Sequence, residues 1–226
     1  MSQRRHEFFH VVVHPAPQPV LLRANDYRAL VRALSAALER YPVRIISYAL
    51  LPTHWELVVG PADSASLTRL IEWVTTTQNA RLRQIGRVAA GVSSHTIRIT
   101  AVAPAVDLVR VCRFVERQPM RLELTKRAED WPWSSLADRF RLRPKVPLVT
   151  TRFLTSRAWL DLVNRPLQPF VRSSARHLAE RPRWLTGLPQ RPQHAIGMRG
   201  GHNEDEAHAH VERAKHLVVR HAASTL

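Results

Sequence analysis

Two β-rich runs separated by a two-residue break decide the fold of this chain. They lie in the stretch Tyr48-Ala49-Leu50-Leu51-Pro52-Thr53-His54-Trp55-Glu56-Leu57-Val58-Val59-Gly60-Pro61. Two strands this close together in sequence form a hairpin. Because side chains alternate along a strand, His54 and Glu56 share one face and Trp55 lies on the other. The hairpin is therefore expected to turn its apolar face toward helices and to present a histidine and a carboxylate on the opposite face.

The flanking sequence predicts further strands and helices from hydrophobic periodicity and from helix-start signals. In chain order we expect a strand over 8–14, a helix from Asn25 to Pro42, strands over 43–51 and 54–59, a helix from Ser66 to Gly86 or Gly91, a strand over 96–102, and a helix from Asp107 that Pro119 interrupts. This order, β-α-β-β-α-β, predicts an α+β fold of the ferredoxin-like type, in which both helices lie on one face of the sheet.

The composition changes after about residue 138, which suggests a domain over 1–138 and an extension over 139–226. From Arg139 onward there are 16 Lys and Arg against six Asp and Glu, and seven of the 16 prolines. Such a segment is typical of a basic, partly helical and partly irregular arm. A final helix is expected over about 203–221, with acidic residues at its start and basic residues at its end.

The excess of positive charge is the strongest functional signal in the composition. The chain has 34 Lys and Arg against 18 Asp and Glu, a formal net charge of +16, and all but three of its basic residues are arginine. Proteins that neutralise phosphates need such an excess, and arginine favours bidentate phosphate contacts and stacking on bases. A GC-rich coding sequence is the alternative explanation of the arginine content.

Other features exclude some classes of protein. The single cysteine, Cys112, rules out an internal disulfide framework and a cysteine-based zinc site, and its apolar surroundings predict a buried thiol. No run of residues reaches the ~18 apolar positions of a membrane span, and no signal peptide is recognisable, so a cytoplasmic location without membrane contact is expected.

The spacing of His54 and Glu56 allows both side chains to approach one divalent cation. An imidazole and a carboxylate two residues apart on a strand point to the same side, and a cation held there could polarise a phosphoryl oxygen. The alternative is a solvent-facing pair on an exposed sheet, since this pattern of two residues is common. His95, before the last expected strand, is a further candidate ligand, with surface exposure as its alternative.

Several segments, in order along residues 8 to 136, resemble the HUH-type single-tyrosine transposases, in the REP-associated, insertion-sequence-200-like branch. The hairpin 48–61 is similar to the family pattern Tyr-x-Leu-Met-Pro-Asn-His-hydrophobic-His-Leu-hydrophobic-hydrophobic-x-Pro. The stretch from Phe114 to Arg121 resembles a Tyr-hydrophobic-Glu-x-Asn-Pro-x-Arg segment. The run from Trp131 to Ser135 resembles a Tyr/Trp-Pro-Trp-Ser-Ser signature. The resemblance implies the ferredoxin-like fold and single-stranded or hairpin DNA as the partner. It also allows a homodimer, because family members act as monomers or dimers.

The resemblance also implies a chemistry, namely DNA cleavage and joining during transposition. In that family, two histidines hold Mg²⁺ or Mn²⁺, and a tyrosine attacks the scissile phosphate. Carried over, His54 is the first metal ligand and Glu56 stands at the second. The nucleophile is aligned near Gln78, and the expected helix from Ser66 contains no tyrosine. Four arginines are expected to contact nucleic acid, namely Arg81, Arg83, Arg87 and Arg98.

Three functions therefore remain open at this point. The chain is a transposase that cleaves DNA with a metal ion at His54 and Glu56, a non-catalytic nucleic-acid-binding protein derived from a transposase, or a remnant with neither activity. Metal-dependent nicking that His54→Ala abolishes indicates the first. Salt-sensitive DNA binding that His54→Ala leaves unchanged indicates the second.

Overall fold

Four strands and six helical segments make up the described part of the chain. The computed structural model describes residues 8–16, 21–88, 94–102, 106–141, 144–149 and 152–166. In chain order the elements are β1 (Phe8–Ala16), α1 (Ala24–Arg40), β2 (Val43–Leu50), β3 (Trp55–Pro61), α2 (Ser64–Gln84), β4 (Ser94–Val102), α3 (Val106–Arg121), the 3₁₀ turn η1 (Ala128–Asp130), α4 (Ser135–Arg139) and α5 (Arg157–Asn164).

The strands form one antiparallel sheet in the order β2-β3-β1-β4. Val12 lies opposite Glu56 of β3 on one side and opposite Arg98 of β4 on the other. On the far side of β3, Glu56 lies opposite Ala49 of β2. Residues opposite one another in an antiparallel pair share a face, so this register fixes which side chains gather on each face. The predicted α+β class is confirmed.

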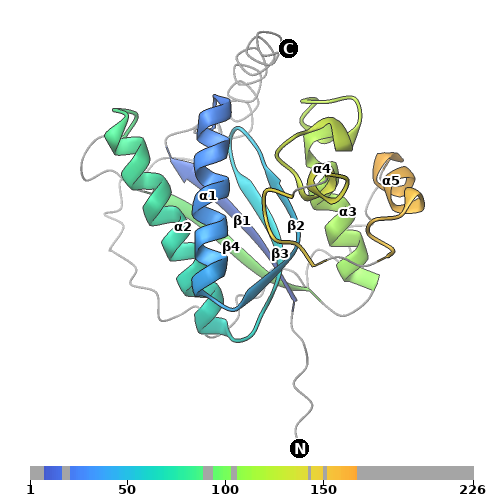
Figure 1. Cartoon of the computed structure of the whole chain (residues 1–226), viewed down its shortest axis with the longest axis horizontal. Helices are drawn as coiled ribbons and strands as arrows, with labels where there is room; N and C mark the ends of the chain where they lie inside the picture. Colours follow the sequence, from blue (N-terminus) through green and yellow to red (C-terminus); the bar gives the residue numbers. More distant parts are fainter. Residues whose placement is uncertain are drawn as a thin grey trace, which may run out of the picture.

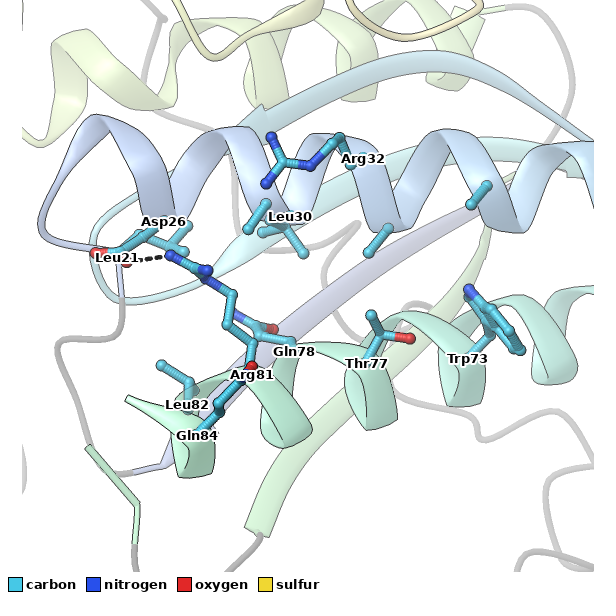
Figure 2. A pocket seen from close by; sticks show the side chains of 13 residues that line it. Leu21, Asp26, Leu30, Arg32, Trp73, Thr77, Gln78, Arg81, Leu82 and Gln84 are labelled. Carbon is cyan, nitrogen blue, oxygen red and sulfur yellow. Dashed lines mark ion pairs between the residues drawn. The ribbon is translucent and has the colours of Figure 1, made fainter. Parts of the chain in front are cut away.

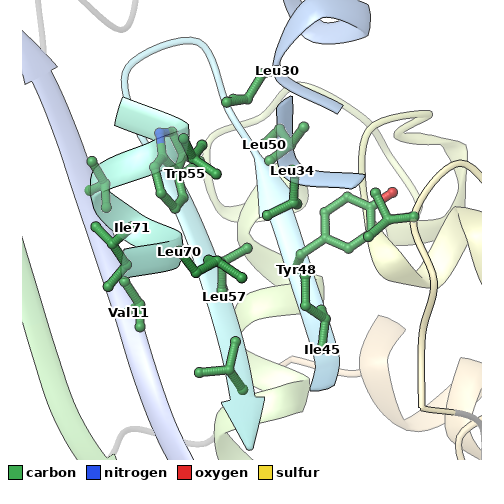
Figure 3. Packing of buried hydrophobic residues seen from close by; sticks show 14 of the residues in the cluster. Val11, Leu30, Leu34, Ile45, Tyr48, Leu50, Trp55, Leu57, Leu70 and Ile71 are labelled. Carbon is green, nitrogen blue, oxygen red and sulfur yellow. The ribbon is translucent and has the colours of Figure 1, made fainter. Parts of the chain in front are cut away.

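Helices α1 and α2 lie side by side across one face of the sheet (Figure 1). Their apolar sides enclose the first hydrophobic core with Val11 of β1, Trp55 and Leu57 of β3 and Tyr48 of β2 (Figure 3). Tyr48 is fully buried. Every second residue of β1 and β3 enters this core, which is the period-2 pattern that a half-buried strand requires.

On the other face of the sheet, α3 packs mainly on β2 and β3, and α5 packs behind α3 (Figure 1). The second core includes Val58 of β3, Cys112 and Val115 of α3, and Trp159 of α5. Cys112 is buried, as predicted, and burial is the main cause that raises the pKa of its thiol to about 12. Pro119 does not interrupt α3, which continues to Arg121.

Two helices begin earlier than the sequence suggested. Asp63, and not Ser66, caps α2: its carboxylate accepts a 2.7 Å hydrogen bond from the backbone N–H of Ser66. Asn25 lies within α1, and the side chain of Asp26 accepts from the backbone N–H of Arg23, the cap residue, at 3.0 Å. At α2, Asp63, Ser64 and Ser66 are all capping residue types, and propensity alone does not choose between them. At α1 the cap residue Arg23 is not a preferred capping type, so propensity did not indicate it.

The described residues after 138 pack with the rest of the fold. The boundary suggested at residue 138 falls inside α4, and Val149 donates a backbone hydrogen bond to Ile45 of β2 at 2.8 Å. Val146 joins the first core and Trp159 the second. The described part of the extension therefore belongs to the same packed unit as the sheet. The helix expected over 203–221 lies outside the described residues.

The Trp131–Ser135 segment lies along the free edge of β2. Trp131 donates from its indole N–H to the carbonyl of Leu50 at 2.8 Å, and the backbone N–H of Leu50 donates to Trp133 at 2.9 Å. The two tryptophans pack around Tyr27 of α1, one edge-on and one stacked. This segment supports the core and covers a sheet edge that would otherwise expose unpaired backbone groups.

Candidate active site

His54 and Glu56 lie at the start of β3, on the sheet face that α3 covers. Glu56 is inside the strand, between Val12 of β1 and Ala49 of β2, and only 3% of its side chain is exposed. His54 immediately precedes the strand and is 11% exposed. The sequence prediction that the two side chains come together is correct in position, since their nearest atoms are 3.1 Å apart.

Three nitrogen groups surround the carboxylate of Glu56. His10 of β1 contacts Oε2 at 2.9 Å, His54 contacts Oε1 at 3.1 Å, and the side-chain amide of Gln118 on α3 donates to Oε1 at 2.7 Å. Burial by itself would raise the pKa of this carboxyl. The hydrogen bonds from His10 and His54, and their charge when protonated, oppose it and hold the pKa at about 2. Glu56 is therefore an ionised carboxylate whose two oxygens are both engaged within the protein.

The second ring nitrogen of His54 is engaged as well. Its Nδ1 lies 3.0 Å from the hydroxyl of Thr53, which fits a tautomer that accepts from Thr53 and donates from Nε2 to Glu56. The ring of His14 stacks on that of His54 at 4.8 Å between centroids. Burial, followed by the charge of His54, lowers the pKa of His14. The histidines on this face thus form a packed, hydrogen-bonded cluster around one carboxylate.

As arranged, His54 and Glu56 are hydrogen-bonded to each other, His54 through Nε2 and Glu56 through Oε1. A cation bound by both side chains would replace this hydrogen bond. Within the described ranges no group of three or more His, Cys, Asp or Glu side chains is placed to hold a metal ion.

Gln78, where the sequence comparison placed the nucleophile, lies on the opposite side of the sheet from His54 and Glu56. It belongs to α2, and its side-chain carbonyl accepts a 3.3 Å hydrogen bond from the indole N–H of Trp55. Trp55 is the neighbour of Glu56 in β3, so its side chain points to the α1–α2 face. His95, a candidate third ligand, lies on that same face, where it is 3.4 Å from Asn79 of α2. The structure therefore brings neither residue to the cluster.

The four arginines expected to bind nucleic acid are divided between the two faces of the sheet. Arg87 donates to Asp26 of α1 at 2.8 Å, and Arg81 forms an ion pair with the same carboxylate at 3.6 Å. These contacts tie the end of α2 to the start of α1. Arg83 is exposed on α2. Of the four, Arg98 alone lies on the face of His54 and Glu56, exposed on β4 opposite Val12.

Sequence reasoning missed the contribution of α3 to this site. Gln118 reaches Glu56 directly, and the ring of Phe114 lies edge-on to His10 at 6.1 Å between centroids. Both residues were inside a segment that resembled the transposase family. That segment has a tyrosine where this chain has Phe114. The sequence thus showed the difference between tyrosine and phenylalanine at residue 114. It did not show that this residue lies next to the cluster.

Comparisons with known proteins give distant structural similarity only. No family model matches the chain, and no curated protein matches it. A solved structure of a REP-associated tyrosine transposase bound to a REP hairpin is similar at 17% identity, with a TM-score of 0.48 over 66% of this chain and 93% of that one. None of the described helices is long and apolar enough to cross a membrane.

Proposed function

We propose that this chain binds single-stranded or hairpin DNA without cleaving it, as a non-catalytic protein derived from a tyrosine transposase. The observation that carries the proposal is the environment of Glu56. Its carboxylate is buried and is held by His10, His54 and Gln118, and the neighbouring aromatic ring on α3 is Phe114, which has no hydroxyl.

Two features support the absence of cleavage. Covalent cleavage of a phosphodiester needs a nucleophile within reach of the group that activates it. Phe114 has no nucleophilic group. Gln78 lies on the opposite side of the sheet, and its side-chain carbonyl is hydrogen-bonded to Trp55. In addition, an activating cation at His54 and Glu56 would have to break the hydrogen bonds that hold this cluster together.

Charge and exposure support the binding of DNA. The net charge of +16 is dominated by arginine, and electrostatic attraction to phosphates needs no active site. On the β1–β4 half of the cluster's face, Thr96 and Arg98 are exposed, and His14 is partly exposed. Imidazole and guanidinium groups can stack on unpaired bases and contact phosphates. This half of the sheet is the surface on which we place the nucleic acid.

A ferredoxin-like fold is part of the proposed relationship to tyrosine transposases. The succession of elements and the sheet order β2-β3-β1-β4 support a ferredoxin-like arrangement, as does the packing of α1 and α2 on one face. The family segments quoted from the sequence lie on β3, on α3 and along the edge of β2. Of these, β3 carries Glu56 and α3 carries Gln118, which donates to it.

Fluorescence anisotropy with a labelled hairpin, a single strand and a blunt duplex tests the binding. We expect saturable binding of the hairpin and the single strand that weakens as salt rises, because each phosphate contact releases counterions. His54→Ala should leave the affinity within about twofold of wild type, since binding does not depend on a metal in this account. Affinity that is flat with salt, or that is equally weak for all three DNAs at low salt, would contradict it.

A further inference from the structure

A groove between α1 and α2 contains N–H groups that lack acceptors. Its volume is about 330 Å³. Leu30 and Ala33 line it from α1, and Trp73, Gln78 and Arg81 line it from α2 (Figure 2). The groove lies on the side of the sheet opposite the His54–Glu56 cluster, so it is separate from the surface proposed to bind DNA.

Three side-chain donors at this groove are shielded from solvent. Within the described ranges, Trp73 Nε1, Gln78 Nε2 and Arg81 Nε have no hydrogen-bond partner. Gln78 is 94% buried, and the indole N–H of Trp55 fixes its orientation because that donor requires the amide oxygen. Buried donors without acceptors are uncommon in folded proteins and are destabilising. An occupant of the groove that carries acceptor oxygens would remove this deficit.

The charge around the groove favours an anion. Asp26 supplies the one carboxylate among the lining residues, and its Oδ2 already accepts from two backbone N–H groups and from Arg87. Arg81 approaches the other oxygen only to 3.6 Å, which is an ion pair longer than a hydrogen bond. Two guanidinium groups thus share one carboxylate, and the exposed Arg32 adds a further positive charge at the rim.

We infer that this groove binds a small organic monocarboxylate with an apolar body. Gln78 and Arg81 are three residues apart on α2, so their side chains lie on one face of the helix, about one turn apart. Their N–H groups would donate to the ligand carboxylate, for which a guanidinium edge is a geometric match. The apolar body would lie against Leu30 and Ala33. The indole N–H of Trp73, further along the groove, would serve a second acceptor on larger ligands.

Nuclear magnetic resonance on the full-length protein tests this inference with benzoate as the probe. The Trp73 indole N–H and the Gln78 side-chain amide provide signals at the site, assigned with Trp73→Phe and Gln78→Glu. Benzyl alcohol is the neutral analogue of similar size, and inorganic phosphate is an anion without an apolar body. We expect both signals to shift saturably with benzoate. Benzyl alcohol and inorganic phosphate should each need at least tenfold higher concentrations to produce the same shift.

Two substitutions locate the binding. Arg81→Gln should weaken benzoate binding roughly ten- to hundredfold, as the loss of a charged hydrogen bond does, and Arg83→Gln on the same helix should not change it. Gln78→Glu keeps an acceptor for Trp55 and the ion pair of Arg81, but replaces the donor with oxygen, so it should also weaken binding. Gln78→Glu therefore tests the inference if Arg81→Gln fails to fold. The absence of a saturable shift, equal binding of benzyl alcohol or phosphate, or an equal loss in Arg83→Gln would overturn the inference.

Discussion

The side-chain amide of Gln118 on α3 donates a 2.7 Å hydrogen bond to Glu56 on β3, and so joins the helix to the buried carboxylate of the sheet. With His10 and His54 on the other sides, the carboxylate is supplied with donors from β1, from α3 and from the turn before β3. A buried carboxylate in such an environment contributes to the stability of the fold whether or not it takes part in any reaction.

Glu56→Gln should therefore lower the free energy of unfolding by about 2 to 3 kcal/mol, because the amide turns an N–H₂ group toward donors that need an acceptor. Urea denaturation followed by circular dichroism measures the change. Glu72→Gln, at an exposed position on α2, removes the same charge and should change stability by less than about 0.5 kcal/mol. Equal stability of Glu56→Gln and wild type would mean that the carboxylate is not held as described.

Phe114→Tyr tests whether the site lacks only a hydroxyl nucleophile or also lacks free oxygens on Glu56 to hold a metal ion. The substitution would add a hydroxyl to the ring beside His10. We expect no covalent protein–DNA adduct in this variant with Mn²⁺, because the oxygens of Glu56 remain engaged by His10, His54 and Gln118. Denaturing gel electrophoresis with a labelled hairpin measures it. An adduct in Phe114→Tyr alone would show that the cluster can still hold a metal and that the hydroxyl is the missing part.

Arg98→Gln should weaken binding to single-stranded DNA and reduce the dependence of log affinity on log salt by roughly 0.7 to 1 per lost phosphate contact. The reason is its exposed position on the sheet face of His54. Arg87→Gln is the matched control: it removes the same charge at the ion pair with Asp26 on the other side of the sheet. We expect it to lower stability more than DNA affinity. Salt titrations of both variants separate the two roles, and identical losses of affinity would contradict the placement of the DNA.

Asp26 gives a pH-dependent contribution to stability. Burial would raise its pKa, but backbone hydrogen bonds and Arg87 together hold the pKa below its usual value of 3.8. Because the folded-state pKa is the lower one, the stabilisation is present above about pH 4 and is lost as pH falls further. We expect Asp26→Asn to lower the free energy of unfolding by about 2 kcal/mol at pH 6 and by progressively less below pH 4. Denaturation curves at pH 6, 4 and 3 measure the difference in stability between wild type and Asp26→Asn. A difference that does not change with pH would mean that folding does not lower the pKa of Asp26.

Trp159 ties α5 to α3 and so to the sheet. Its indole N–H donates a 2.7 Å hydrogen bond to Glu116, a fully buried carboxylate that also pairs with Arg139. Trp159→Phe keeps an aromatic side chain but removes the indole N–H and part of the buried volume, and it leaves one carboxylate oxygen without its donor, so we expect a loss of at least about 2 kcal/mol. Amide hydrogen exchange should increase over residues 152–166 before it increases in β3. Phe140→Leu, at a side chain that is 49% exposed and lies outside this segment, should change neither measurement.

The sequence was informative where a pattern is local and less so where the outcome depends on neighbours. The hairpin around Pro52-Thr53, the strands and the burial of Cys112 followed from periodicity. Gln78 and Arg81 of α2, and Arg87 just after it, lie on the side of the sheet opposite the cluster because α2 packs on that side. No property of α2 alone specifies the side on which it packs. The role of His10 depends on the register of β1 against β3, which pairs residues 46 positions apart. The hydrogen bond from Gln118 likewise required the docking of α3.

The central claim is that the chain holds hairpin DNA without forming a covalent bond to it. The most direct measurement incubates the wild-type protein with labelled hairpin oligonucleotides and Mn²⁺, and scores binding on a native gel and adducts on a denaturing gel from the same tubes. The account predicts a shifted, salt-sensitive band on the first gel and free, uncleaved oligonucleotide on the second. A protein-linked or nicked oligonucleotide that His54→Ala abolishes would contradict it.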